Sequence, residues 1–167
     1  DPLRREHIHR MLLRAAAQEV IPIINYNDPV SDEENRKMEL AIRRSHGDQV
    51  VECVDNDETA AVIANLVHAK KLVLMTSTEG IYRDPTDPKT LVEQVTAKSM
   101  EELEEKVRQL QESCVGASRA GANGAKAKLE YALKTARQGT MVIIGHARHR
   151  LSDLVEGRVA CTRIGLE

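Results

Sequence analysis

Four short polar stretches carry the residue types that could bind or transform a small ligand. The first two combine carboxylates with side-chain amides, the third combines hydroxyl groups with a glutamate, and the fourth combines glycines with lysines. They occupy residues 25–28, 55–57, 76–80 and 121–128. Carboxylate and amide groups can hold a small polar ligand, whereas glycines that open a helix can hold a phosphate.

The stretch at 121–128 has the composition of a phosphate-binding loop. Gly121 and Gly124 precede a helical pattern, so backbone N–H groups and the helix dipole could cradle a phosphate. Lys126 or Lys128 could add a positive charge at a phosphoryl group that is being transferred. The P-loop spacing Gly-x-x-x-x-Gly-Lys-Ser/Thr is absent. A solvent-exposed loop of glycine and alanine is the alternative interpretation.

The two acidic stretches also have simpler interpretations. Asn25 and Asp28 belong to a cluster of residues that is typical of a turn. Asp55, Asn56 and Asp57 precede an apolar helical pattern, where Asp or Asn can cap free backbone N–H groups. The same side chains could instead present a carboxylate and an amide to a ligand, and the sequence leaves both possibilities open.

Histidines and cysteines show no metal-binding spacing, so the sequence predicts no metal site. His146 and His149 flank Arg148 after a predicted strand, an arrangement that could suit an anion. The three cysteines are an odd number and indicate reduced thiols in a cytosolic protein. The sequence also lacks the Gly-x-Ser-x-Gly elbow of many hydrolases.

Alternating helices and strands must position these stretches. Apolar residues at helical spacing predict helices at 3–18, 31–44, 57–67, 99–112, 125–138 and 151–156. Short apolar runs predict strands at 20–24, 49–53, 71–75, 91–95, 140–144 and 159–164. Pro22 favours an edge position or a local irregularity for the first strand, and Ser99 with Glu102 has the form of a capping box. The alternation predicts an α/β fold, a three-layer αβα sandwich with a mainly parallel sheet.

Length and composition suit one soluble globular domain over residues 1–167. The net charge is -2 and the charges are interspersed, which gives no indication of nucleic acid or an anionic membrane as a partner. No apolar run approaches the ~20 residues of a membrane helix, and no secretory signal is visible. Because the chain starts at Asp1, we expect a piece of a longer protein whose N-terminal half is not included.

Taken together, these stretches resemble the amino-acid kinase family, and within it the glutamate 5-kinases. Residues 20–28 are similar to a family strand that ends in Asn-x-Asn-Asp, and residues 55–67 to a helix that starts with Asp-Asn-Asp. Residues 71–85 are similar to the strand on the nucleotide side and its Gly-Leu-Tyr-x-x-Asp-Pro loop. Residues 124–132 are similar to the glycine-rich loop that enters a helix at Thr-Lys-Leu.

The resemblance implies transfer of the γ-phosphoryl group of ATP to the side-chain carboxylate of an amino acid, with glutamate as the expected substrate and Mg²⁺ as a cofactor. That reaction is the first step of proline biosynthesis and takes place in the cytoplasm. The implied amino-acid-binding residues are Asn25, Asp28 and Asn56. The implied ATP-binding residues are Thr76, Ser77, Gly121, Gly124 and Lys128. Lys128 and Asp57 are implied as catalytic, with Lys128 stabilising charge in the transition state.

The chain departs from the family pattern on the nucleotide side. The family has Thr-Asp where this chain has Thr76 and Ser77, and it has threonine where this chain has Ala127. These differences favour an alternative function, a diverged non-catalytic domain that binds a small ligand or a partner chain. A sheet that lacks part of its fold would expose an edge, so we also expect a homo-oligomer.

Overall fold

The computed structural model describes residues 2–24, 56–113 and 124–167, and the chain divides into two compact units, 1–59 and 60–167. Each unit is described by itself. The predicted helix at 31–44 and the predicted strand at 49–53 lie outside the described residues. The expectation of one domain over the whole chain stays a prediction. No helix in the described ranges is long and apolar enough to cross a membrane.

The described part of the first unit begins with helix α1, Pro2–Ala17, which confirms the predicted helix. Its apolar positions Ile8 and Leu12 are buried, as their spacing of one helical turn predicts. The helix ends where Glu19 adopts a φ of 56°, and the Val20 N–H donates to the Ala15 carbonyl over 2.9 Å. A left-handed residue with such a bond is a common way to satisfy the last carbonyls of a helix.

The predicted strand at 20–24 is wrong, because the structure has no regular element there. Ile21 and Ile23 are 87% and 94% exposed. Pro22 has no N–H to give to a strand ladder, and none of the described strands pairs with this segment. The β-branched residues of this segment favour an extended backbone, but no strand in the described residues pairs with it.

Helix α3 spans the boundary between the units, and the other elements belong to the second unit. The helices are α3 (Asn56–Leu66), the 3₁₀ helix η1 (Pro88–Thr90), α4 (Met100–Ser113), α5 (Gly124–Ala136) and α6 (Leu151–Glu156). The strands are β1 (Lys71–Thr76), β2 (Gln94–Ala97), β3 (Met141–His146) and β4 (Cys161–Leu166). Every element predicted within the second unit's described ranges is present, with β2 and β4 beginning a few residues later than predicted.

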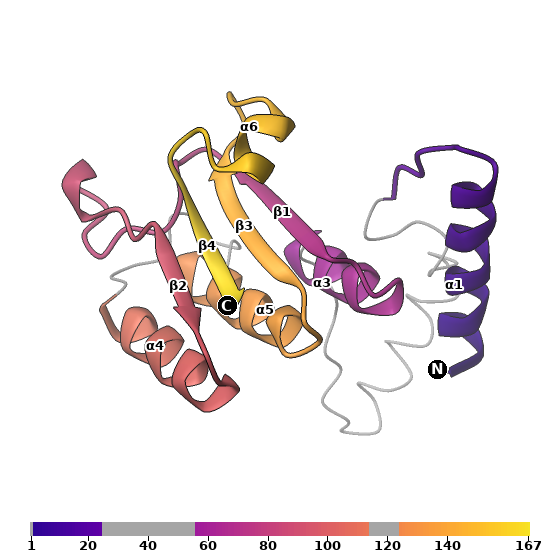
Figure 1. The fold of residues 1–167 in the computed structure, drawn as a ribbon, viewed down its shortest axis with the longest axis horizontal. Helices are drawn as coiled ribbons and strands as arrows, with labels where there is room; N and C mark the ends of the chain where they lie inside the picture. The colour runs from indigo at the N-terminus through magenta and orange to yellow at the C-terminus, as the bar shows by residue number, and fades with distance from the viewer. Residues whose placement is uncertain (1, 25–55, 114–123) are drawn as a thin grey trace, which may run out of the picture. The chain divides into compact units, whose positions relative to one another are not determined.

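The strands form one sheet in the order β1-β3-β4-β2 (Figure 1). β1 pairs parallel with β3 and β2 pairs parallel with β4, whereas β3 and β4 are antiparallel. The prediction of a mainly parallel sheet is therefore confirmed. Because β1 and β3 are parallel neighbours, the loops that follow them leave the sheet at the same edge.

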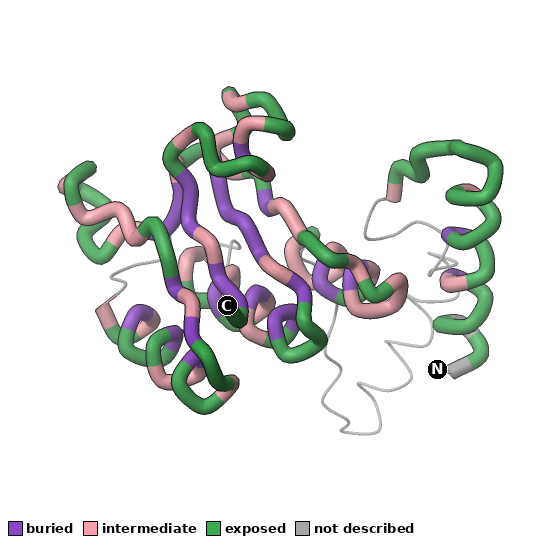
Figure 2. The backbone as a smooth tube through the Cα atoms, in the orientation of Figure 1, coloured by how far each residue is buried: buried purple, intermediate pink, exposed green. Residues whose placement is uncertain are grey.

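Helices cover both faces of this sheet, as a three-layer α/β fold requires. On one face, α4 and α5 contribute Leu103, Val107 and Leu129 to the main core, and Ala60 of α3 packs against it. On the other face, Leu154 of α6 packs with Ile143. Figure 2 shows buried residues along β3 and β4, the two central strands of the sheet. Full burial of a leucine or isoleucine side chain stabilises the fold by about 1.5–3 kcal/mol.

Local signals fix the ends of two helices. Ser99 Oγ accepts the Glu102 N–H over 3.2 Å, which confirms the predicted cap of α4. The Glu102 carboxylate accepts the N–H of Lys98 over 3.3 Å, so the return bond of the predicted capping box reaches one residue further back. After α5, Gly139 adopts a φ of 82°, a left-handed conformation that turns the chain into β3.

Candidate functional site

The carboxyl ends of β1 and β3 form one edge of the sheet, where two loops begin. Thr76, the last residue of β1, is in register with His146, the last residue of β3. The Ala147 N–H donates to the Thr76 carbonyl over 2.8 Å, which extends the ladder into the loops. The loop at 77–80 and the turn at 147–150 therefore start side by side.

Two of the predicted ATP-binding residues, Thr76 and Ser77, lie at this edge. The Thr76 hydroxyl accepts the Thr78 N–H over 2.9 Å and lies 3.1 Å from the Thr78 hydroxyl. The Thr78 hydroxyl also donates to the Gly80 carbonyl over 3.0 Å. The loop is thus folded on its own hydroxyl groups, and Ser77 is exposed at its start.

A carboxylate joins the two loops, and sequence reasoning missed it. Glu79 Oε2 lies 2.6 Å from His149 Nε2, and Glu79 Oε1 accepts from the Arg148 guanidinium. Arg148 with its flanking histidines was predicted to suit an anion, and in the structure an anion of the chain itself, Glu79, contacts it. The only signal in the sequence was the position of an acidic residue and two basic residues just after neighbouring strands.

The far end of the 77–80 loop is anchored on β4. The Ile81 N–H donates to Thr162 Oγ1 over 2.8 Å inside the protein. Gly80 approaches the same residue so closely that a Cβ added there would lie 2.3 Å from Thr162 Oγ1 and 2.9 Å from the Thr162 nitrogen. The position therefore requires glycine because of space, and the loop is held at both ends.

The N-terminus of α5 carries the other described residues that were predicted to bind the nucleotide, Gly124 and Lys128. Gly124 begins the helix with a φ of 60°, a conformation that glycine adopts without strain. Lys126 is exposed and Lys128 is half-buried, and the first turn has no acidic residue. Because α5 packs on the sheet and turns at 137–140 into β3, its N-terminus faces the edge at which β1 and β3 end.

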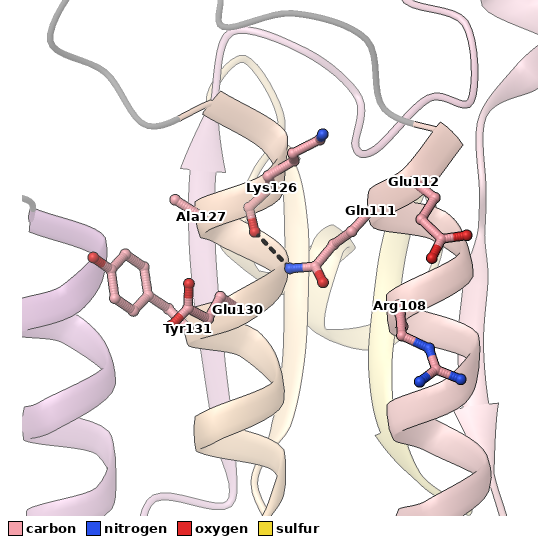
Figure 3. A pocket seen from close by; sticks show the side chains of 7 residues that line it. All are labelled: Arg108, Gln111, Glu112, Lys126, Ala127, Glu130 and Tyr131. Carbon is pink, nitrogen blue, oxygen red and sulfur yellow. Dashed lines mark hydrogen bonds between the residues drawn. The ribbon is translucent and has the colours of Figure 1, made fainter.

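A surface pocket of about 540 Å³ lies between the last turns of α4 and the first turns of α5 (Figure 3). Its lining side chains include both charges: Arg108, Gln111, Glu112, Lys126, Ala127, Glu130 and Tyr131. Gln111 Nε2 bridges the two helices by donating to the Lys126 carbonyl over 3.0 Å. The pocket includes Lys126 but not Lys128, Thr76 or Ser77, so it adjoins the predicted nucleotide residues without containing most of them.

The predicted amino-acid side of the site is described only in part. Asn56 is exposed and Asp57 is half-buried in the first turn of α3, which belongs to the first unit. Asn25 and Asp28 lie outside the described residues, as does Gly121 of the predicted ATP-binding set. Among the residues that the structure describes, no group of three or more His, Cys, Asp or Glu side chains could hold a metal ion. The roles of all these residues stay predictions.

The sequence was also compared with protein families and with curated proteins. The model of the amino acid kinase family matches residues 1–146. A glutamate 5-kinase of Geobacillus kaustophilus is 33% identical over 149 residues, which cover 87% of this chain and 34% of the relative. A glutamate 5-kinase of Shouchella clausii is 28% identical over 169 residues, 99% of this chain and 40% of the relative. The chain thus spans well under two thirds of these relatives.

Two further similarities are more local or more distant. An acetylglutamate kinase of Methanopyrus kandleri is 46% identical over 59 residues, which cover 35% of this chain and 24% of the relative. Among solved structures, a carbamate kinase from Giardia lamblia bound to AMP-PNP superposes with a TM-score of 0.51 at 17% identity. That match covers 68% of this chain and 32% of the other, and it supports the fold alone.

Proposed function

The chain belongs to the amino acid kinase family, and from this premise we propose that it carries the nucleotide side of a glutamate 5-kinase-like enzyme. The enzyme would transfer the γ-phosphoryl group of ATP to the side-chain carboxylate of an amino acid, with glutamate as the first candidate. The names of the relatives support this choice, since glutamate 5-kinases match most of this chain.

The observation that carries the proposal is the start of α5. Gly124 opens a helix whose first five residues include two lysines and no acidic residue, at the edge where the loop with Thr76 and Ser77 begins. Free N–H groups and the positive end of the helix dipole favour an anion at such a position. A nucleotide whose phosphates bind there would have its γ-phosphoryl group beside Lys128.

Lys128 would then act on the transition state. A carboxylate oxygen of the substrate attacks the γ-phosphorus while the bond to the β-γ bridging oxygen of ATP breaks, which yields an acyl phosphate and ADP. Charge builds up on the transferred group and on the leaving oxygen, and a preorganised ammonium group stabilises that charge. On the amino-acid side, Asn25, Asp28, Asn56 and Asp57 are assigned by resemblance. No covalent enzyme intermediate is required.

The described residues fit ATP better than they fit a metal cage. The α5 N-terminus suits phosphates because of its free N–H groups and lysines, whereas the carboxylate of Glu79, at the same edge, already contacts Arg148 and His149. Mg²⁺ in phosphoryl-transfer enzymes is usually held by the substrate phosphates and one or two carboxylates. We therefore assign no protein ligand to Mg²⁺, and no step of the proposed mechanism depends on one.

The test is an assay of the longest natural form of the protein with ATP and Mg²⁺. Glutamate, N-acetylglutamate and carbamate are compared, with ADP release as the common readout and hydroxylamine trapping for the acyl phosphates. Specificity is the ratio of kcat/KM values, and we expect glutamate to exceed the other two by about tenfold or more. ADP release that depends on none of the three substrates would overturn the proposal.

A non-catalytic binding module is the second candidate, and the loop after β1 favours it. Ser77 supplies a neutral hydroxyl where the family has aspartate, and the Thr76 hydroxyl is engaged with Thr78. Such a module would bind ATP without turnover. ATP binding together with an absence of ADP release from the longest natural form would decide for this candidate.

We also propose that the protein is a homo-oligomer and that it acts in the cytoplasm as an enzyme of proline biosynthesis. β1 is an edge strand of the described sheet. Met75 on this strand and Val62 on α3 are exposed apolar side chains of the second unit, and exposed edges and apolar patches tend to be covered by a partner. A monomeric mass in light scattering of the longest natural form would contradict the oligomer.

A further inference from the structure

We propose that Glu79 is a positioning residue, whose carboxylate holds the loop with Thr76 and Ser77 against the turn after β3 in the arrangement that the nucleotide requires. The inference rests on the proposed function for its consequence, nucleotide affinity. The tie itself is argued from contacts between residues of the second unit only.

Glu79 makes two contacts with cationic or basic groups that both belong to the turn after β3. His149 Nε2 is 2.6 Å from one carboxylate oxygen, and the Arg148 guanidinium donates to the other. The turn itself is ordered: the Arg148 N–H donates to His146 Nδ1 over 3.0 Å, and the His149 N–H donates to the His146 carbonyl over 3.1 Å. The Glu79 side chain of the first loop therefore contacts two residues, Arg148 and His149, of a turn that has its own hydrogen bonds.

The Glu79 and His149 side chains are less exposed than the partners in the other ion pairs described for the second unit, whereas the Arg148 side chain is 63% exposed. The Glu79 side chain is only 17% exposed, whereas that of Glu156, which pairs with Arg158, is 57% exposed. Exposed pairs contribute little because water and salt screen them. A shielded carboxylate that accepts from two basic groups is held more strongly, and its removal would leave Arg148 and His149 next to each other without the anion.

The loop would loosen without unfolding when this tie is lost. Its start is fixed by the bond from the Ala147 N–H to the Thr76 carbonyl, and its end by the bond from the Ile81 N–H to Thr162 Oγ1. Neither bond involves the Glu79 side chain. Between these anchors, the Glu79 side chain crosses from one loop to the other by its contacts with Arg148 and His149.

A loosened loop would affect binding more than chemistry. Thr76 and Ser77 are assigned to the nucleotide, and residues that must be ordered at the moment of binding reduce affinity by the cost of that ordering. Once ATP is bound the loop is ordered again, so the transfer step itself would proceed as before. A change in the KM for ATP at constant kcat is therefore the signature of this role, because a mutation that removes binding common to ground and transition states changes KM alone.

The experiment compares Glu79→Gln with the matched control Glu156→Gln, which removes one carboxylate charge from a pair outside the two loops. The first measurement is amide hydrogen exchange of residues 77–79 without nucleotide. The second is the KM for ATP and kcat of the longest natural form, with ATP affinity from calorimetry. For Glu79→Gln we expect the exchange rate of these amides and the KM for ATP to rise about tenfold, which is the usual effect of losing a charge-assisted hydrogen bond. The kcat should stay within about twofold of the wild-type value. Glu156→Gln should change none of these quantities.

Four outcomes would overturn the inference. Unchanged exchange in Glu79→Gln would mean that the carboxylate does not tie the loops, and an equal loss of kcat would mean a general structural role. A wild type that binds ATP, together with a Glu79→Gln variant of unchanged KM, would remove the positioning role alone. A wild type that does not bind ATP would overturn the proposed function and the positioning role with it.

Discussion

Replacing Gly80 with alanine should destabilise the second unit by about 2–4 kcal/mol, which is large relative to the total stability of a small domain. The added methyl group would lie 2.3 Å from Thr162 Oγ1 and 2.9 Å from the backbone nitrogen of the same residue. The backbone atom cannot rotate away, so the loop and β4 must separate. Gly80 does not have a left-handed φ, so the expected destabilisation comes from the close contact and not from backbone strain.

The magnitude combines two contributions. Forcing an extra carbon into a packed site costs about 1–3 kcal/mol. Separation of the loop from β4 would also weaken the buried bond between the Ile81 N–H and Thr162 Oγ1, a contribution of about 0.5–1.5 kcal/mol. The free energy of unfolding is measured by urea denaturation followed by circular dichroism, for the variant and the wild type under the same conditions.

Two controls separate the close approach from other effects. Gly139→Ala places a methyl group where no atom lies within 4 Å, at a φ of 82°, so it should show only the backbone cost of about 1–2 kcal/mol. Thr162→Ala removes the nearest atom, so the Gly80→Ala/Thr162→Ala double variant should be more stable than the sum of the single effects by about 0.5 kcal/mol or more. A Gly80→Ala variant within about 0.5 kcal/mol of the wild type would refute the reasoning.

Three further predictions concern a helix end, an acidic turn and the core. Gly157→Ala should cost about 1–2 kcal/mol in urea denaturation, because Gly157 ends α6 at a φ of 73° and an added Cβ would lie 2.8 Å from Arg163 Nη2; equal stability would contradict this. Hydrogen bonds from the Thr86 hydroxyl and N–H hold the pKa of Asp84 below its usual 3.8. The ionised carboxylate therefore stabilises the turn above pH 3.8. As the pH falls below that value, the Thr86 amide should lose its protection against hydrogen exchange. Protection of the Thr86 amide that does not change with pH would exclude the role of Asp84. Leu129→Ala should cost about 2–5 kcal/mol by leaving a cavity at a fully buried position, and a loss under about 1 kcal/mol would mean that the site is not closely packed.

Most elements of the second unit could be predicted because their signals are local. Apolar residues one helical turn apart and the cap at Ser99 both act within a few residues of chain, and both predictions are confirmed. The segment at 20–24 shows the limit of this reasoning. Its β-branched residues favour an extended chain, but a strand also needs a neighbour, and sequence spacing does not reveal one.

The candidate site also contains some features that could be predicted from the sequence and others that could not. Loops after parallel strands meet at one edge by a topological rule, so the place of Thr76 and Ser77 could be predicted. The partner of Arg148 and His149 could not, because Glu79 lies far from them in sequence and reaches them only through the pairing of β1 with β3. The close approach of Gly80 to Thr162 likewise depends on how β4 packs.

The most direct test of the central claim is a calorimetric titration of the chain with ATP, comparing the wild type with Lys128→Ala. Lys134→Ala is the control, since Lys134 lies on the same helix and pairs with Glu130 on its exposed surface. Loss of a charged contact to phosphate should weaken ATP binding by about tenfold or more in Lys128→Ala, whereas Lys134→Ala should bind as the wild type does. Equal ATP affinity in the wild type and Lys128→Ala would contradict the assignment of the phosphates to the start of α5.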